Sequence, residues 1–121
     1  MKLTNVLAVA NPSTGIYVRA SGYIYATSLT AHANGEEGVK LVTSSAPITV
    51  TGSNLVSSNG SDGLYAESVK GKISISNVVA SSNTRNGIHA VSTTGNISIT
   101  GSTANDNYQN GMLLNSIGNF Y

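Results

Sequence analysis

The sequence predicts an all-β fold of the parallel β-helix (β-solenoid) class, with five coils of about 24 residues and three short strands per coil. Two observations lead to this fold class. A pattern of glycine, asparagine and apolar residues repeats five times along the 121 residues, and apolar and hydroxyl residues alternate within each repeat. Repeats at such a period are typical of solenoids, and alternation at period two is typical of strands with one buried face.

Three linked positions define the repeat. A glycine followed by an apolar residue recurs at spacings of 23, 25, 24 and 24 residues, and an asparagine stands four residues before each glycine. The glycines are Gly15, Gly38, Gly63, Gly87 and Gly111, and the asparagines are Asn11, Asn34, Asn59, Asn83 and Asn107. We therefore interpret residues 1–121 as a single domain. Its coils are 1–22, 23–46, 47–71, 72–95 and 96–118, with 119–121 starting a further coil.

Each coil is expected to contribute three strands and no helix. The first strand is an alternating run such as 73–76, the second follows the glycine, as at 88–90, and a less regular third strand occupies a bridge such as 78–80. Stacking of successive coils would bury faces that one coil cannot bury alone. The expected inward-facing sets are Met1/Ile24/Ile48/Ile73/Ile97, Leu3/Ala26/Val50/Ile75/Ile99 and Ile16/Val39/Leu64/Ile88/Met112.

The repeated asparagines and glycines have a structural explanation. Identical amides stacked at strand spacing can hydrogen-bond along the solenoid axis, and asparagine tolerates the left-handed backbone of a sharp corner. A glycine at each corner indicates either a positive φ or a close approach to the neighbouring coil. We therefore expect Asn11 to Asn107 to form a ladder rather than a ligand site.

The repeats resemble those of the pectin-lyase-like superfamily of parallel β-helices, which includes bacterial surface proteins. The resemblance covers the whole chain and is carried by motifs such as 96–104 and Asn107-x-x-x-Gly111-Met112. It implies a right-handed solenoid with an extracellular or cell-surface location. It implies little about activity, because that superfamily includes lyases, hydrolases, adhesins and structural spikes.

Composition argues against several classes of partner. The net charge is +1 and only 9% of residues are charged, so there is no electrostatic reason to expect binding to nucleic acid or to an anionic membrane. No apolar run approaches the length of a membrane span. The absence of cysteine excludes disulfides and thiolate metal ligands.

The chain is not expected to be an enzyme or to bind a cofactor or metal. Catalysis by paired carboxylates needs two acids that face one bond, whereas the five acids are scattered. They are Glu36, Glu37, Asp62, Glu67 and Asp106, which we expect to be solvated acids in turns. His32 has no partner at ligand spacing, and His89 should point outward as an ordinary surface histidine.

Two outward-facing sets of residues remain as candidate binding surfaces. Tyr17, Lys40, Tyr65 and His89 would lie at coil spacing and could contact the sugar rings of a polysaccharide. Paired hydroxyl sets resemble the ice-binding face of β-solenoid antifreeze proteins, although Lys2, Tyr25 and several serines interrupt them. These sets are Thr4/Thr27/Thr51/Ser76/Thr100 and Lys2/Tyr25/Thr49/Ser74/Ser98.

The favoured functional hypothesis is a structural one. Neither end of the sequence shows a capping segment, and 118–121 aligns with the start of another coil. We expect the chain to stack end to end on copies of itself as filaments, or to pack against adjoining coils of a longer adhesin-like stalk. Glycan binding and ice binding are the alternatives.

Overall fold

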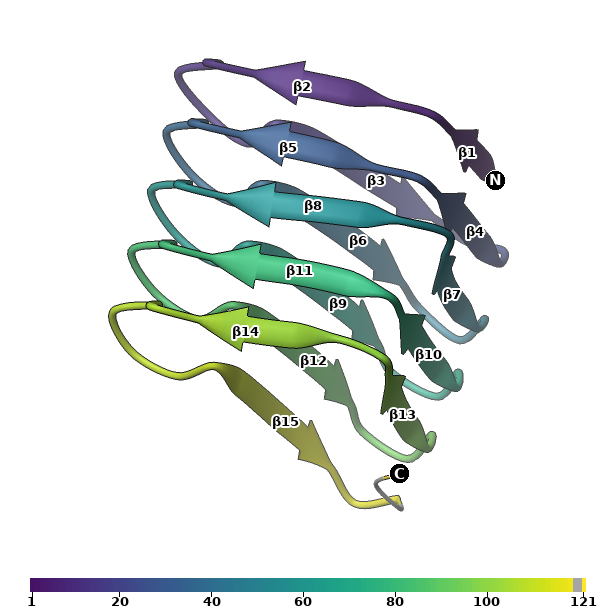
Figure 1. The fold of residues 1–121 in the computed structure, drawn as a ribbon. Helices are drawn as coiled ribbons and strands as arrows, with labels where there is room; N and C mark the ends of the chain where they lie inside the picture. Colours follow the sequence, from purple (N-terminus) through teal and green to yellow (C-terminus); the bar gives the residue numbers. More distant parts are fainter. Residues whose placement is uncertain (119–120) are drawn as a thin grey trace.

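The computed structural model describes residues 1–118 and 121. Within them the chain forms fifteen strands and no helix, and the strands assemble into three five-stranded sheets. We name these sheets A, B and C in the order in which the chain first enters them. The three sheets enclose one core, and the chain passes through each sheet once per coil (Figure 1).

Sheet A contains the first strand of every coil. Its strands are β1 (Lys2–Thr4), β4 (Ile24–Thr27), β7 (Ile48–Thr51), β10 (Ile73–Ser76) and β13 (Ile97–Thr100). Sheet B follows it: β2 (Leu7–Val9), β5 (Thr30–His32), β8 (Asn54–Ser57), β11 (Val78–Ser81) and β14 (Thr103–Asn105). Sheet C is made of β3 (Ile16–Ala20), β6 (Val39–Thr43), β9 (Leu64–Ser68), β12 (Ile88–Ser92) and β15 (Met112–Ser116).

All strand pairs are parallel, and each joins a strand to its equivalent in the next coil. The register pairs the repeat positions with one another: Ile73 lies opposite Ile48 and Ile97, and Ile88 lies opposite Leu64 and Met112. The predicted five-coil β-solenoid with three strands per coil is therefore confirmed. The strand of sheet B, expected to be less regular, is present in all five coils.

The core consists of stacked aliphatic side chains, as the alternating pattern predicts. Ile24, Ile48, Ile73 and Ile97 are each at most 1% exposed, because each lies between the sheets and under neighbouring coils. Met1 and Met112, which we expected in the same inward-facing sets, are instead 58% and 38% exposed. Both belong to the outermost described coils, where a coil covers them on one side only.

The backbone at the corners differs from the sequence-based expectation. Positive φ does not occur at the ladder asparagines or at the glycines that follow them. It occurs one residue before each asparagine, at Ala10, Ala33, Ser58, Ser82 and Asp106. A second set, between sheets A and B, comprises Asn5, Ser28, Gly52, Asn77 and Gly101. The left-handed conformation turns the chain there, and the side chains of Asn34, Asn59 and Asn83 that follow these turns are buried.

The start of a further coil, expected at 119–121, falls partly outside the described residues, since 119 and 120 are not among them. Tyr121 is described, and its backbone pairs with β13: its N–H donates to the carbonyl of Ile97, and its carbonyl accepts from the N–H of Ile99 (2.9 Å each). Within the described residues, no helix is long and apolar enough to cross a membrane.

Candidate functional site

The regular spacing of the asparagines produces a continuous hydrogen-bonded ladder at the corner between sheets B and C. The side-chain Nδ2 of Asn34 donates to Oδ1 of Asn59 at 3.0 Å, and the pattern repeats from Asn11 to Asn34, from Asn59 to Asn83 and from Asn83 to Asn107. Each acceptor oxygen also receives the backbone N–H of the preceding asparagine. Every amide thus points the same way along the axis.

The corner glycines of the first four coils are required because the next coil approaches closely. A Cβ built on Gly63 would lie 2.6 Å from Nδ2 of Asn83 and 2.7 Å from the carbonyl oxygen of Gly87. Both distances are shorter than side-chain carbons tolerate. Of the two explanations left open by the sequence, close approach therefore applies at this position, whose φ is not positive.

A second polar ladder, which sequence reasoning missed, runs one residue before the corner glycines. Oδ1 of Asp62 accepts hydrogen bonds from the backbone N–H and Nδ2 of Asn86 at 3.0 and 2.7 Å, and Nδ2 of Asn110 donates to Asn86 at 2.9 Å. In the first two coils the hydroxyl of Thr14 donates to Glu37 at 3.0 Å. The available signal was that the residue before every corner glycine is polar.

Asp62 is therefore not the solvated turn acid that we expected. It is 1% exposed, and its second oxygen, Oδ2, lies 3.1 Å from Nδ1 of His89. Burial would raise the pKa of Asp62, but the hydrogen bonds from His89 and Asn86 outweigh burial and hold the pKa below its ordinary value. A carboxylate in this state makes Nδ1 of His89 the donor.

His89 also departs from the expected surface histidine, because its side chain is 15% exposed. Its Nε2 is buried and has no hydrogen-bond partner among the described residues. The edge of its ring meets the ring of Tyr65 at a centroid distance of 5.0 Å and an angle of 87°. His89 is thus packed into the outer surface of sheet C rather than extended from it.

Tyr17, Lys40 and Tyr65, which occupy equivalent positions in successive coils, come together on the same face. The ammonium of Lys40 lies 5.8 Å from the ring centre of Tyr17 and 5.5 Å from that of Tyr65. It also lies 3.7 Å from a carboxylate oxygen of Glu37. Tyr17 is 56% exposed, so its ring is the most accessible part of this cluster.

Tyr65 is held by internal contacts. Its hydroxyl donates to Glu67 at 2.6 Å, and burial together with this hydrogen bond raises the pKa of Tyr65. Asp62 and Glu67 engage different partners: Asp62 binds His89 and Asn86, whereas Glu67 binds Tyr65. We call Tyr17, Lys40, Tyr65 and His89, with their acidic partners, the sheet C cluster.

The chemistry available to the sheet C cluster is recognition of polar and ring-bearing groups. It combines one exposed aromatic ring, one ammonium and carboxylates that already have partners. Among the described residues there is no group of three His, Cys, Asp or Glu side chains arranged to hold a metal ion. An open aromatic ring beside a cation and acids suits a ligand that has both apolar ring faces and hydroxyls.

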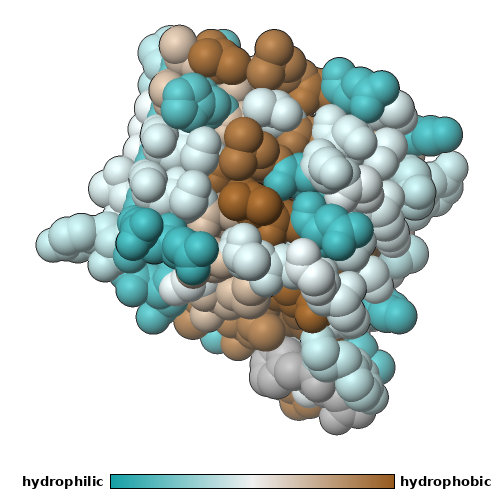
Figure 2. Space-filling model, viewed as in Figure 1, coloured by the Kyte–Doolittle hydropathy of each residue, from teal (hydrophilic) through white to brown (hydrophobic). Residues whose placement is uncertain are grey.

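The other two faces differ from sheet C. Figure 2 shows a stripe of hydrophobic side chains along the face formed by sheet B, where Leu7, Leu55 and Val79 are 69%, 42% and 46% exposed. The described strands of this sheet contain no Asp, Glu, Lys or Arg. The hydroxyl sets considered for ice binding lie on the outside of sheet A, and the hydroxyl of Thr51 there donates to that of Tyr25. Within the described strands, Arg19, Lys40 and Glu67 lie on sheet C, and Lys2 on sheet A is the other charged residue.

Comparison with known proteins identifies the family. The model of the right-handed β-helix region matches residues 1–120. The chain belongs to the right-handed β-helix family. No curated protein and no solved structure gave a significant match.

Membership of the right-handed β-helix family agrees with the resemblance seen in the repeats and with the parallel architecture. The match extends over nearly the whole chain, so every coil described above belongs to the family region. A β-helix is a scaffold on which unrelated functions occur, and function has to be argued from its surfaces.

Proposed function

We propose that this β-helix is a structural segment of an extracellular or cell-surface assembly, in which its end faces stack on further coils. Those coils belong either to a second copy of the chain, forming filaments, or to a longer stalk of the adhesin type. In both arrangements the solenoid acts as a rod-like structural element and performs no catalytic step.

The observation that carries this proposal is the unidirectional asparagine ladder. Among the described residues it ends at Asn11 on one side and at Asn107 on the other, and each coil between them donates to the next. A further coil could extend the ladder only with the same polarity, which favours head-to-tail contact. Such a contact does not close on itself and so produces linear assemblies.

The exposed inward-facing residues of the outermost described coils support the same conclusion. Met1 and Met112 are 58% and 38% exposed, and Leu3 and Leu114 are only partly buried against the core. Stacking would remove this apolar surface from water, and each Å² buried would stabilise the assembly by roughly 25 cal/mol.

Electron microscopy and sedimentation of the purified chain test self-stacking. We expect concentration-dependent linear assemblies with a repeat of roughly 24 Å, five times the interstrand spacing. Leu3→Lys and Leu114→Lys should abolish them, since each places a charge on a stacking face. Leu7→Lys is the matched control, because Leu7 is in the first coil but is 69% exposed on the outside of sheet B. A strictly monomeric chain, or equal assembly by all three variants, would contradict self-stacking.

A second candidate function is glycan binding by the sheet C cluster. The specific observation in its favour is that Tyr17 keeps an exposed ring beside Lys40 and Glu37. Pyranose rings stack on aromatic faces, and hydroxyls bind to ammonium and carboxylate groups.

A glycan array tests this second function. Tyr17→Ala should remove binding while preserving the fold, because the Tyr17 side chain projects into solvent. Tyr65→Ala is less informative, since Tyr65 also contacts His89 and Glu67 inside the cluster. Retained binding by the Tyr17 variant would exclude the sheet C cluster as the glycan site.

A further inference from the structure

A separate aromatic cluster lies on the outside of sheet A. Tyr23 is 60% exposed and Tyr25 is 38% exposed. Together with Lys2, Pro47 and Thr49 they line an open depression of about 440 Å³. None of these residues takes part in the polar ladders or in the sheet C cluster. Exposed aromatic side chains gathered around a depression are typical of a binding surface.

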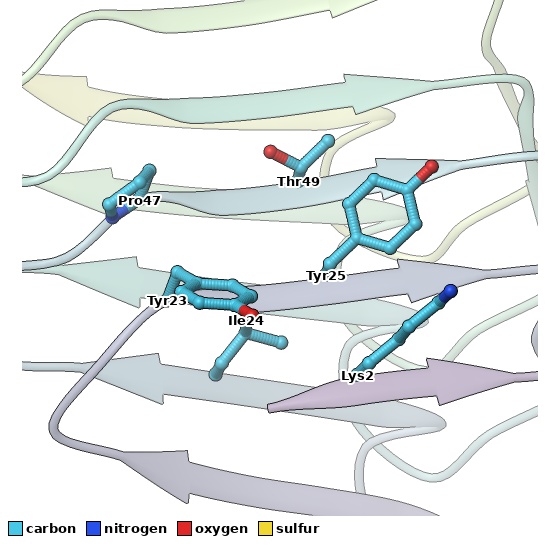
Figure 3. Close-up of a pocket in the computed structure, with 6 residues that line it drawn as sticks. All are labelled: Lys2, Tyr23, Ile24, Tyr25, Pro47 and Thr49. Atoms are coloured by element: carbon cyan, nitrogen blue, oxygen red, sulfur yellow. The ribbon is translucent and has the colours of Figure 1, made fainter.

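The two tyrosine rings face the depression in different orientations. Figure 3 shows the ring of Tyr25 nearly face-on, lying between β4 and β7, whereas the ring of Tyr23 is seen edge-on beside it. Pro47, which precedes β7, lies on the far side of Tyr23 from Tyr25. Tyr25 thus provides a floor and Tyr23 a side wall, and Thr49 stands on β7 beside them (Figure 3).

The polar groups around the depression are all able to donate hydrogen bonds. The hydroxyl of Thr51 donates to that of Tyr25 at 3.3 Å, which leaves the Tyr25 proton for another acceptor. The ammonium of Lys2, 6.0 Å from the centre of the Tyr25 ring, is a donor only. Of the described side chains that line the depression, none is a carboxylate or a carboxamide.

We propose that this depression binds a proline-rich peptide in the polyproline II conformation. The carbonyls of such a peptide have no internal hydrogen bonds, and proline has no N–H, so the ligand offers acceptors and apolar rings. Proline-rich segments dock in aromatic-lined grooves, where their preformed helix lowers the entropy lost on binding. A saccharide would instead present hydroxyls that donate as well as accept, and carboxylate or carboxamide side chains would suit it better. A peptide bound here would occupy the outside of sheet A, which end-to-end stacking of coils does not use.

Titration of the full chain with a synthetic decaproline peptide, followed by calorimetry and by NMR chemical shifts, tests the proposal. We expect saturable binding, with shift changes confined to the residues that line the depression. Tyr25→Ala and Tyr23→Ala should each weaken binding by about tenfold or more. Tyr17→Ala is the control on sheet C and should leave decaproline binding unchanged. Circular dichroism checks that the variants keep the fold.

Absence of saturable binding, or unchanged affinity in both tyrosine variants, would overturn the proposal. Binding of a cello-oligosaccharide at the depression, lost in the Tyr25→Ala variant, with no binding of decaproline would also overturn it and assign the site to carbohydrate. Neither result would affect end-to-end stacking or glycan binding at Tyr17, because those functions use other surfaces.

Discussion

Asn59 occupies the middle of the asparagine ladder, and its side chain hydrogen-bonds to groups in the coils before and after its own. Its Oδ1 accepts the backbone N–H and Nδ2 of Asn34, and its own Nδ2 donates to Asn83 and to the carbonyl of Ala31. A single asparagine therefore connects the coil below it to the coil above it. Removing this buried amide would lower the stability of the fold mainly because its hydrogen-bond partners would be left buried and unpaired.

We expect Asn59→Ala to lower the free energy of unfolding by at least about 2 kcal/mol, since each buried donor left without an acceptor costs about 1–3 kcal/mol. Urea denaturation followed by circular dichroism measures the change. Asn105→Ala is the matched control: Asn105 is exposed, and the substitution should alter stability by less than about 0.5 kcal/mol. Equal losses in the two variants would refute the role of the ladder.

The buried Asp62 predicts a stability that depends on pH. Because the folded-state pKa of Asp62 is below its ordinary value of 3.8, ionised Asp62 stabilises the fold above that value. The contribution disappears as the pH falls through the folded-state pKa. Asp62→Asn should thus destabilise the chain at neutral pH, and the difference from wild type should narrow as the pH falls below 3.8. Asp106→Asn, at an exposed site, is the control and should change the stability at neutral pH by less than about 0.5 kcal/mol.

Residues that repeat identically were predictable from sequence, and residues that do not repeat were not. The asparagine set could be recognised because the same side chain recurs in every coil. Asp62 belongs to a set whose other members include Thr14 and Asn86, so only a shared polarity, and no repeated residue type, marked its position in the sequence. The positive φ at Ala10 and Ala33 gave no signal either, because alanine rarely adopts that conformation.

At the scale of the elements, the first four coils pack so closely against the next coil at the corner that a glycine must precede each sheet C strand there. The carbonyl oxygen of Gly87 and the side chain of Asn83 fill the space next to Gly63. This contact ties the start of β9 to that of β12, whose pairing then continues from Leu64 with Ile88 to Ser68 with Ser92. The alternating runs made the strands predictable. The close approach of neighbouring coils at the corner was one of two explanations for the glycines, the other being a positive φ.

Gly63→Ala should destabilise the fold by about 1–3 kcal/mol, because the added methyl group forces β9 away from its neighbour. Gly22→Ala provides the matched control. A Cβ on Gly22 meets no atom within 4 Å and its φ is not positive, so this variant should be neutral or slightly stabilised. Thermal unfolding of the two variants compares their stabilities. A Gly63 variant as stable as the Gly22 variant would contradict the prediction, because it would mean that the backbone at the corner shifts to make room for the methyl group.

At the scale of the whole molecule, each coil contacts only the coils next to it. Strand pairs join equivalent elements of adjacent coils, and among the described residues no strand pair skips a coil. Stability in such a chain is approximately the sum of coil and interface contributions. Repeats therefore predicted the architecture well, while the surfaces of sheets A and C, which vary from coil to coil, had to be seen in three dimensions.

Hydrogen exchange should reveal this nearest-neighbour organisation. We expect the slowest amide exchange in β7 to β9, which have coils on both sides, and faster exchange in β1 to β3, which have a neighbour on one side. Mass spectrometry of peptide fragments at neutral pH measures the gradient. Uniform protection across all coils would show that the chain opens only as a single cooperative unit.

The equivalence of Ile48 and Ile73 in the register has a consequence for how such a gene can change. Removing 48–72 joins Pro47 directly to Ile73 and leaves every asparagine, glycine and inward-facing isoleucine of the remaining coils in place. Unequal recombination between repeats could thus remove or add one whole coil while the remaining coils keep their register. The shortened chain should still fold, with a lower unfolding midpoint because one interface is missing. Circular dichroism of that deletion variant would show whether the chain still folds when it has one coil fewer.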